Sequence, residues 1–138
     1  MDVVLLLARI LFAVVFLASG MGHLTQTEAM AGYAGSKGVP MPKQATLVSG
    51  VVLIVGALFV VLGLWGDLGA LMLFAFLVPT ALVMHQFWKE TDPMMKMTEM
   101  VQFNKDISLA GAALAFVWIF SAYPDLTLTD PLFGFDLV

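Results

Sequence analysis

Four long apolar stretches constrain this chain more than any other feature of its sequence. A helix needs about 20 apolar residues to cross the hydrocarbon core of a bilayer, and the core offers the backbone no hydrogen bonds, so each stretch should be helical. Only Gly66 and Asp67 separate the second stretch from the third, which predicts a tight hairpin. We predict an all-α integral membrane protein, an antiparallel bundle of four transmembrane helices. The predicted spans are residues 3–24, 45–65, 68–88 and 103–123.

The composition agrees with a membrane protein and excludes several classes of function. Hydrophobic residues make up 61% of the 138 residues and charged residues 12%, with a mean hydropathy of +0.98; soluble domains have about 45–50% apolar residues. The absence of cysteine excludes disulfides, thiolate catalysis and iron–sulfur clusters. No basic cluster suits nucleic acid, so the bilayer is the first expected partner.

The two ends of the chain are interpreted as parts of one membrane domain covering residues 1–138. The first apolar stretch has no basic segment before it and carries Arg9, so we expect a first span and not a secretory signal peptide. The last segment, residues 124–138, should lie over the membrane surface as an acidic tail. In this tail the apolar contacts are expected from Leu132, Phe133 and Phe135.

Short interfacial helices are expected in the two longer connections. Thr27 can cap a helix that runs to about Lys37. In the other connection Asp92 precedes Pro93, a pattern typical of a helix start. The second helix could be a separate interfacial element or an extension of the fourth span.

The distribution of lysines predicts the orientation in the membrane. Cytoplasmic loops carry an excess of lysine and arginine, and the lysines lie in or beside the two longer loops, whereas the opposite side carries acids. We therefore expect both termini outside, with loops 25–44 and 89–102 in the cytoplasm; Arg9, near the outer end of the first span, weakens this prediction slightly. The lysines are Lys37, Lys43, Lys89, Lys96 and Lys105, and the acids are Asp2, Asp67, Asp125, Asp130 and Asp136.

Small residues suggest how the spans pack. Small side chains let the backbones of membrane helices approach closely. The second span carries a seam of small residues at a spacing of seven, and the fourth span a seam at spacings of three and four. The first seam is Ser49, Gly56 and Gly63, and the second is Ser108, Gly111 and Ala115.

Four regions of the sequence bring polar side chains to one predicted depth. Spans one and three run inward, so His23 and His85 lie near their cytoplasmic ends, and span four starts on that side with Lys105 and Asp106. Ionisable groups within spans are costly and often functional. The hydrated ends of spans, or pairing of Lys105 and Asp106 with each other or with Glu99, would also account for them. The candidate ligand-binding residues are His23, His85, Gln86, Phe87, Phe103, Lys105, Asp106 and Arg9.

Several ligands are compatible with this layer. A quinone or a lipid headgroup requires only hydrogen-bonding side chains and aromatic walls. Haem between the two histidines ranks second, and a metal ion ranks third, because no ligand spacing supports it. The alternative that this layer binds no cofactor also stays open, and no catalytic residue can be named.

Arg9 lies about two turns into the first span, where no acid in any span can meet it. It shares a helical face with His23, which favours the bundle interior. A long arginine side chain could also snorkel to lipid phosphates, or to Asp2 or Asp67. We place the snorkelling interpretation slightly ahead of a ligand role.

The segment HQFWKETDPMMKMTEMVQFNKDISLAGAAL, residues 85–114, resembles the DoxX family of small four-span bacterial membrane proteins. The family pattern has His-x-Phe-Trp, a polar loop, Phe-x-Lys-Asn and a later glycine. ARILFAVVFLASGMGHL in the first span and GVPMP before the second are similar to the family as well. The matching positions are His85, Phe87, Trp88, Phe103, Lys105, Asp106 and Gly111.

This sequence departs from the family pattern at two points. Asp106 stands where asparagine is more common, and Ser49 and Gly50 stand where many members have an early acid in the second span. The resemblance implies a subunit in the bacterial cytoplasmic membrane, associated with oxidoreductase systems such as quinone-linked sulfur oxidation or oxidative-stress assemblies. It implies no defined active site.

Three functions follow, in order of preference. The first is a small subunit of a larger redox assembly, contributing to a quinone or lipid headgroup pocket. The second is a non-enzymatic accessory protein that packs on other membrane subunits or on copies of itself, using an adaptable methionine-rich loop. Solute transport ranks last, because four spans could form a pathway only as an oligomer. The loop methionines are Met94, Met95, Met97 and Met100.

Overall fold

The computed structural model describes residues 2–134, and within that range the chain is all helical, with four long helices and no strand. Each long helix has the length and apolar composition needed to cross a membrane, which confirms the predicted all-α, four-span fold. A shorter helix and two single-turn helices complete the chain. The elements are α1 (Val3–Thr25), α2 (Thr27–Ser36), α3 (Pro42–Leu62), α4 (Gly66–Met84), η1 (Phe87–Lys89), α5 (Pro93–Ala122) and η2 (Pro124–Leu126).

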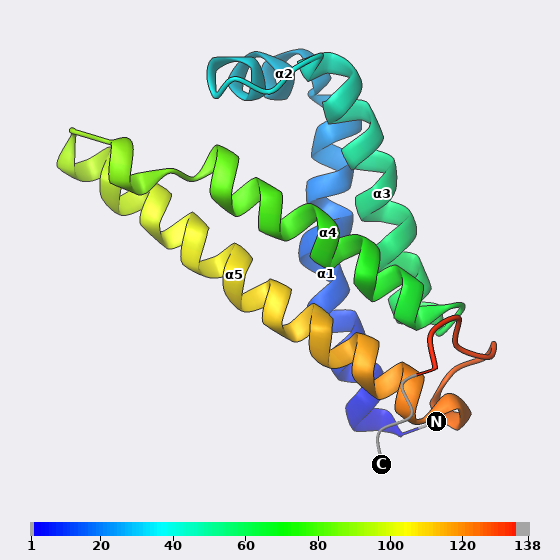
Figure 1. Ribbon diagram of the computed structural model, residues 1–138. Coiled ribbons are helices and arrows are strands. Elements are labelled where there is room, and N and C mark those ends of the chain that lie inside the picture. The colour runs from blue at the N-terminus through cyan, green and yellow to red at the C-terminus, as the bar shows by residue number, and fades with distance from the viewer. Residues whose placement is uncertain (1, 135–138) are drawn as a thin grey trace.

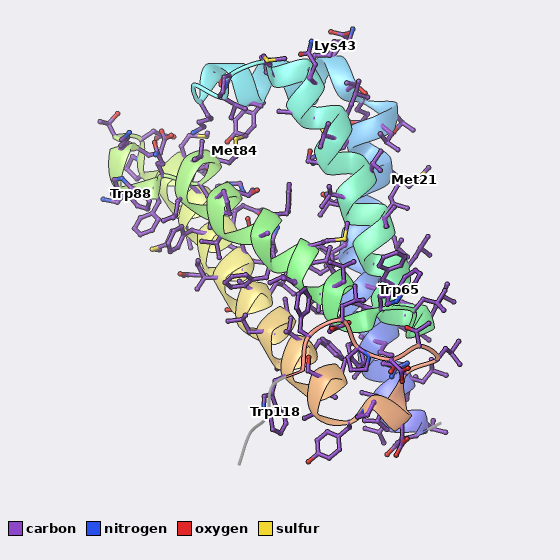
Figure 2. The ribbon with its side chains drawn as sticks, turned by 45° about the vertical axis from the view of Figure 1, so that its right-hand side comes forward. Met21, Lys43, Trp65, Met84, Trp88 and Trp118 are labelled. Carbon is purple, nitrogen blue, oxygen red and sulfur yellow. The ribbon has the colours of Figure 1, made fainter. Side chains whose placement is uncertain are left out.

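The long helices form two antiparallel pairs that meet at one end and spread apart at the other (Figure 1). Helix α1 packs along α3, α4 packs along α5, and α3 joins the pairs by contacting α4. Both ends of the described chain lie where the pairs meet, whereas α2 lies at the spread end (Figure 1). Figure 2 shows Lys43 at the spread end of the first pair, and Met84 and Trp88 at that of the second.

Local signals set the helix boundaries. The Asp92 side chain accepts a hydrogen bond of 3.2 Å from the backbone N–H of Met95, and Pro93 is the first helical residue. Helix α5 then runs without a break to Ala122, so the second longer loop contains an extension of the fourth span. Gly63, at φ 69°, ends α3, which places the α3–α4 turn before Gly66 and puts Asp67 inside α4.

The core lies where the two pairs meet. Leu53, Ala57 and Leu73 are fully buried between α3 and α4. The rings of Phe12 on α1 and Phe116 on α5 are 4.9 Å apart and close the other side. Packing of these side chains against each other is what holds membrane helices together, since lipid tails are as apolar as the core.

The small-residue seam of α3 contacts neighbouring helices, whereas that of α5 does not. A Cβ atom on Gly56 would lie 3.1 Å from the carbonyl oxygen of Gly69 on α4. A Cβ on Gly111 would meet nothing within 4 Å, and Ser108 and Ala115 are exposed as well. The predicted α5 seam is therefore wrong. The face that carries Phe116 and Phe120 turns inward instead, which leaves the small residues outside.

Candidate functional site

A cavity of about 560 Å³ lies at the spread end of the molecule and is the candidate site. This volume is in the usual range for small-molecule sites. All four long helices and α2 contribute to its wall, which is mainly apolar. The polar and aromatic side chains of the wall include His23, Tyr33, Ser49, Phe76, His85 and Asp106.

His23 forms the polar part of one wall, near the end of α1. Its Nδ1 lies 2.7 Å from Ser49 Oγ and 3.3 Å from the carbonyl oxygen of Thr46, both on α3. The ring also packs edge-on against Phe76 of α4, with centroids 6.0 Å apart. These contacts fix the orientation of the imidazole at the cavity wall.

His85 forms the polar part of the opposite wall. Helix α4 ends at Met84, and the non-helical backbone of His85 (φ −114°, ψ 53°) directs the ring to α5. Its Nδ1 lies 2.7 Å from Glu99 Oε2, and its Nε2 lies 3.6 Å from Asp106 Oδ2. The ring thus lies between two carboxylates, both at least 95% buried.

Glu99 also holds α2 against α5. The Tyr33 hydroxyl donates a 2.7 Å hydrogen bond to Glu99 Oε1. Burial raises the pKa of the Tyr33 phenol, and the hydrogen bond to Glu99 and the charges of Glu99 and Glu90 raise it further. Tyr33 therefore stays protonated and donates this hydrogen bond. A 3.3 Å ion pair between Lys37, at the end of α2, and Glu90, after η1, is a second polar contact at this end of the molecule.

The predicted site residues divide into two groups. His23, His85, Lys105 and Asp106 all line the cavity. The other three residues of this end do not line it. Gln86 donates a 2.9 Å hydrogen bond to the carbonyl oxygen of Leu82, and the rings of Phe87 and Phe103 pack with Trp88 in a separate cluster.

The sequence did not identify Glu99 as the partner of His85, or Tyr33 as a member of the site. Glu99 lies seven residues before Asp106, two helical turns away on the same face of α5. That spacing is the signal that could have found it. Tyr33 lies on a short helix outside the spans, where hydrophobic periodicity carries no information about partners.

Arg9 lies at the end where the helix pairs meet, away from the cavity. Its side chain is 0% exposed, its Nη2 donates to the carbonyl oxygen of Leu126, and its guanidinium lies 4.8 Å from the centroid of the Phe120 ring. Among residues 2–134 no acid lies within ion-pair distance of it. Snorkelling to lipid phosphates, Asp2 or Asp67 is therefore wrong.

The segment after α5 explains why Arg9 is buried, because it folds back across the ends of the helices (Figure 1). The backbone N–H of Leu128 donates to the carbonyl oxygen of Gly63 at 2.8 Å, and the backbone N–H of Phe133 donates to Asp67 Oδ2 at 2.7 Å. Asp67, counted from the sequence as an outer-loop acid, is itself 0% exposed. Phe135 and Asp136 lie outside the described residues.

The polar groups of the cavity do not form a metal centre. In the part of the chain that the structure describes, no group of three or more histidine and acidic side chains is arranged to hold a metal ion. The arrangement instead offers hydrogen-bonding groups around an apolar space, which suits the polar end of an organic molecule.

The comparisons with known proteins agree with this architecture. The sequence model of the DoxX family matches residues 4–86, more than half of the chain. This chain belongs to the DoxX family. It is also 30% identical over 112 residues to the inner membrane protein YphA of Escherichia coli (strain K12). The aligned region covers 81% of this chain and 79% of YphA. No solved structure is significantly similar to this DoxX protein.

Proposed function

We propose that this DoxX protein is a subunit of a larger redox or oxidative-stress-related assembly in the bacterial inner membrane, and that its cavity takes the headgroup of a quinone or a lipid. The observation that carries the proposal is the placement of His23 and the His85–Asp106 pair on opposite walls of one apolar cavity. Ionisable groups at membrane depth are costly, so their convergence on a cavity favours a ligand role.

The cavity suits a ring or headgroup carried on an apolar tail. Phe76, Pro79 and Val83 of α4 give it apolar surface at membrane depth, and such surface holds a flat ring by burial. The histidines and Lys105 supply the few polar groups that fix the orientation of a bound headgroup. A long hydrocarbon tail could then extend between the helix pairs into lipid.

The cavity is proposed to face the cytoplasm. The lysines of the spread end support this orientation, and the similarity to the inner membrane protein YphA supports the inner membrane. Because the chain has no cysteine, single cysteines test the topology cleanly. Ser36→Cys should react with an impermeant maleimide only after the cells are opened, whereas Asp125→Cys should react in intact spheroplasts. The reverse pattern would contradict the orientation.

The ligand is tested by purifying the protein with its native lipids and quantifying co-purified quinone and phospholipid by mass spectrometry. We expect a near-stoichiometric ligand in the wild type. Loss of one hydrogen bond to the headgroup should reduce its retention about tenfold in His85→Ala and in Lys105→Ala. Ser108→Ala, on an exposed face of α5, is the matched control.

The same measurement identifies which part of the proposal fails. Equal retention of quinone in wild type, His85→Ala and Lys105→Ala would remove the cavity as its site. Retention of phospholipid alone would assign the cavity to a lipid headgroup. Where the parent assembly can be isolated, unchanged quinone-dependent turnover with either alanine variant would contradict a role in its quinone site.

A second candidate function is a non-catalytic accessory subunit. It is favoured by the exposed methionines at the start of α5, since Met94 is 76% and Met97 is 66% exposed. Methionine side chains adapt to irregular partner surfaces. Replacing both residues by serine should release this subunit from its partners while leaving its own fold intact. Continued co-purification would exclude docking through these residues.

A further inference from the structure

Four hydroxyl groups in the cavity wall already donate their hydrogens within the protein. Each hydroxyl has one hydrogen to donate. The hydroxyls of Thr46, Ser49 and Thr80 donate to backbone carbonyl oxygens of their own helices, at distances between 2.7 and 2.9 Å. The Tyr33 hydroxyl donates to Glu99. None of these four groups can donate to a ligand without breaking an internal hydrogen bond.

The contacts of His23 favour a hydrogen on one of its two ring nitrogens. A backbone carbonyl oxygen can only accept, so the 3.3 Å contact with Thr46 favours a hydrogen on Nδ1. Ser49 Oγ lies 2.9 Å from the Thr46 carbonyl oxygen and 2.7 Å from Nδ1, so it can accept from Nδ1 while it donates to that carbonyl. With the hydrogen on Nδ1, the neutral ring carries a free lone pair on Nε2, which makes no hydrogen bond within residues 2–134.

Asp106 supplies a second acceptor from the other wall. The residue is 5% exposed, and its oxygens lie 3.6 Å from His85 Nε2 and 3.7 Å from Lys105 Nζ. Both distances exceed a normal hydrogen bond, so the carboxylate keeps unused acceptor positions at the cavity. A buried carboxylate without close donors gains strongly when a ligand supplies one.

Few donors remain to balance these acceptors. Lys105 has three hydrogens, but its side chain is 46% exposed and it already donates to Gln102. Among the lining hydroxyls, Ser19 has a hydrogen that no hydrogen bond within the described range uses. The Nδ1 of His85 is paired with Glu99, and a hydrogen on its Nε2 would face Asp106 at 3.6 Å. The buried part of the wall is therefore richer in acceptors than in donors.

We propose that the cavity selects a ring that donates hydrogen bonds, the hydroquinone form of a quinone couple, over the oxidised quinone. His23 Nε2 accepts from one ring hydroxyl, and the Asp106 carboxylate accepts from the other. An oxidised quinone has only acceptor oxygens, and these would face the acceptors of the wall. The inference rests on the proposed quinone site and adds the redox form that the site prefers.

The test measures binding of three small rings to the purified protein in lipid nanodiscs under anaerobic conditions. The probes are tetramethylhydroquinone, tetramethylbenzoquinone and the dimethyl ether of the hydroquinone, which keeps the ring but has no donor. We expect the hydroquinone to bind at least about tenfold more tightly than either other probe, the usual effect of leaving a buried polar group unpaired.

Two substitutions on opposite walls test the assignment of the acceptors. Asp106→Asn keeps the shape of the side chain and adds a donor, so it should reduce the hydroquinone preference to about threefold or less. His23→Phe keeps a ring of similar size without nitrogen and should reduce the preference in the same way. Ser108→Ala should retain the full preference. Circular dichroism and size-exclusion elution confirm that each variant is folded.

Each outcome decides a different point. Equal affinity of the wild type for hydroquinone and quinone would overturn the inference and leave the proposed quinone site standing. An unchanged preference in both Asp106→Asn and His23→Phe would overturn the assigned acceptors and with them the inference. No binding of any of the three rings would overturn the inference together with the proposed quinone ligand.

Discussion

Helices α3 and α4 cross at Gly69 with no space for a side chain, so the cost of adding one there can be worked out. A Cβ atom on Gly69 would lie 2.5 Å from the Cβ of Phe59 and 2.7 Å from the carbonyl oxygen of Gly56. Neither atom can rotate away, since one is a Cβ and the other belongs to the backbone. Ordinary contacts between such atoms are about 3.5 Å, so the substitution Gly69→Ala should separate the helices by roughly 1 Å.

The expected cost follows from this separation. Overpacking of a close contact typically costs about 1–3 kcal/mol, whereas alanine gains about 1 kcal/mol over glycine in helix propensity. The difference leaves a net loss, so Gly69→Ala should lower the free energy of unfolding by up to about 2 kcal/mol. Gly111→Ala is the matched control, because a Cβ there meets nothing within 4 Å. It should be neutral or stabilising by up to about 1 kcal/mol.

The assay is reversible unfolding in mixed detergent micelles with increasing sodium dodecyl sulfate, followed by tryptophan fluorescence. Trp65 lies beside the α3–α4 turn (Figure 2) and reports on this crossing. The midpoint of Gly69→Ala should fall below that of the wild type and the midpoint of Gly111→Ala should not. Equal midpoints for the two variants would refute the close crossing of α3 and α4.

Three further predictions concern the polar contacts at the two ends. Glu99→Ala should cost about 2–3 kcal/mol, because it leaves Tyr33 and His85 without their buried acceptor; Glu99→Gln should cost less, and chemical unfolding of both variants checks the order. Because its folded pKa is raised, Tyr33 stabilises the fold fully below the ordinary pKa of about 10, and this contribution should be lost as the pH rises above it; an alkaline unfolding series with Tyr33→Phe as control measures the loss. Arg9→Met removes the contact with Leu126, so hydrogen exchange of residues 124–134 should rise about tenfold or more, and unchanged protection would refute this role of Arg9.

The spans could be predicted from the sequence because hydropathy and length alone decide whether a helix crosses a bilayer. The orientation of each helix about its own axis could not. Ser108, Gly111 and Ala115 form a pattern that favours an interface, yet they face outward. Many faces of a membrane helix are apolar or small, so a small-residue pattern selects no single one. The bulky side chains of the partner helices determine which face turns toward the interior.

For the polar residues, too, depth in the membrane could be predicted from the sequence, whereas the contacts between side chains could not. Topology correctly brought His23, His85, Lys105 and Asp106 to one cavity, because depth follows from position along a span. It could not show that His85 pairs with Glu99, since that contact depends on where α4 ends and how α5 extends beyond the predicted span. Arg9 depended on a tail contact 117 residues away in sequence, which no local pattern encodes.

The two ends of the molecule are held by different kinds of interaction, and this difference bears on how a ligand could enter. Where the helix pairs meet, apolar packing and backbone contacts hold them. At the spread end the link from α2 to the second pair is polar, through Tyr33–Glu99 and Lys37–Glu90.

Two polar contacts resist separation less than the extensive close apolar packing of the other end does. Opening of the molecule should therefore begin at α2. Since α2 also contributes Tyr33 to the cavity wall, loss of the Tyr33–Glu99 hydrogen bond would both open the cavity and free one hydroxyl hydrogen. Entry of the proposed headgroup and the hydrogen-bonding character of its site would thus be linked through one contact.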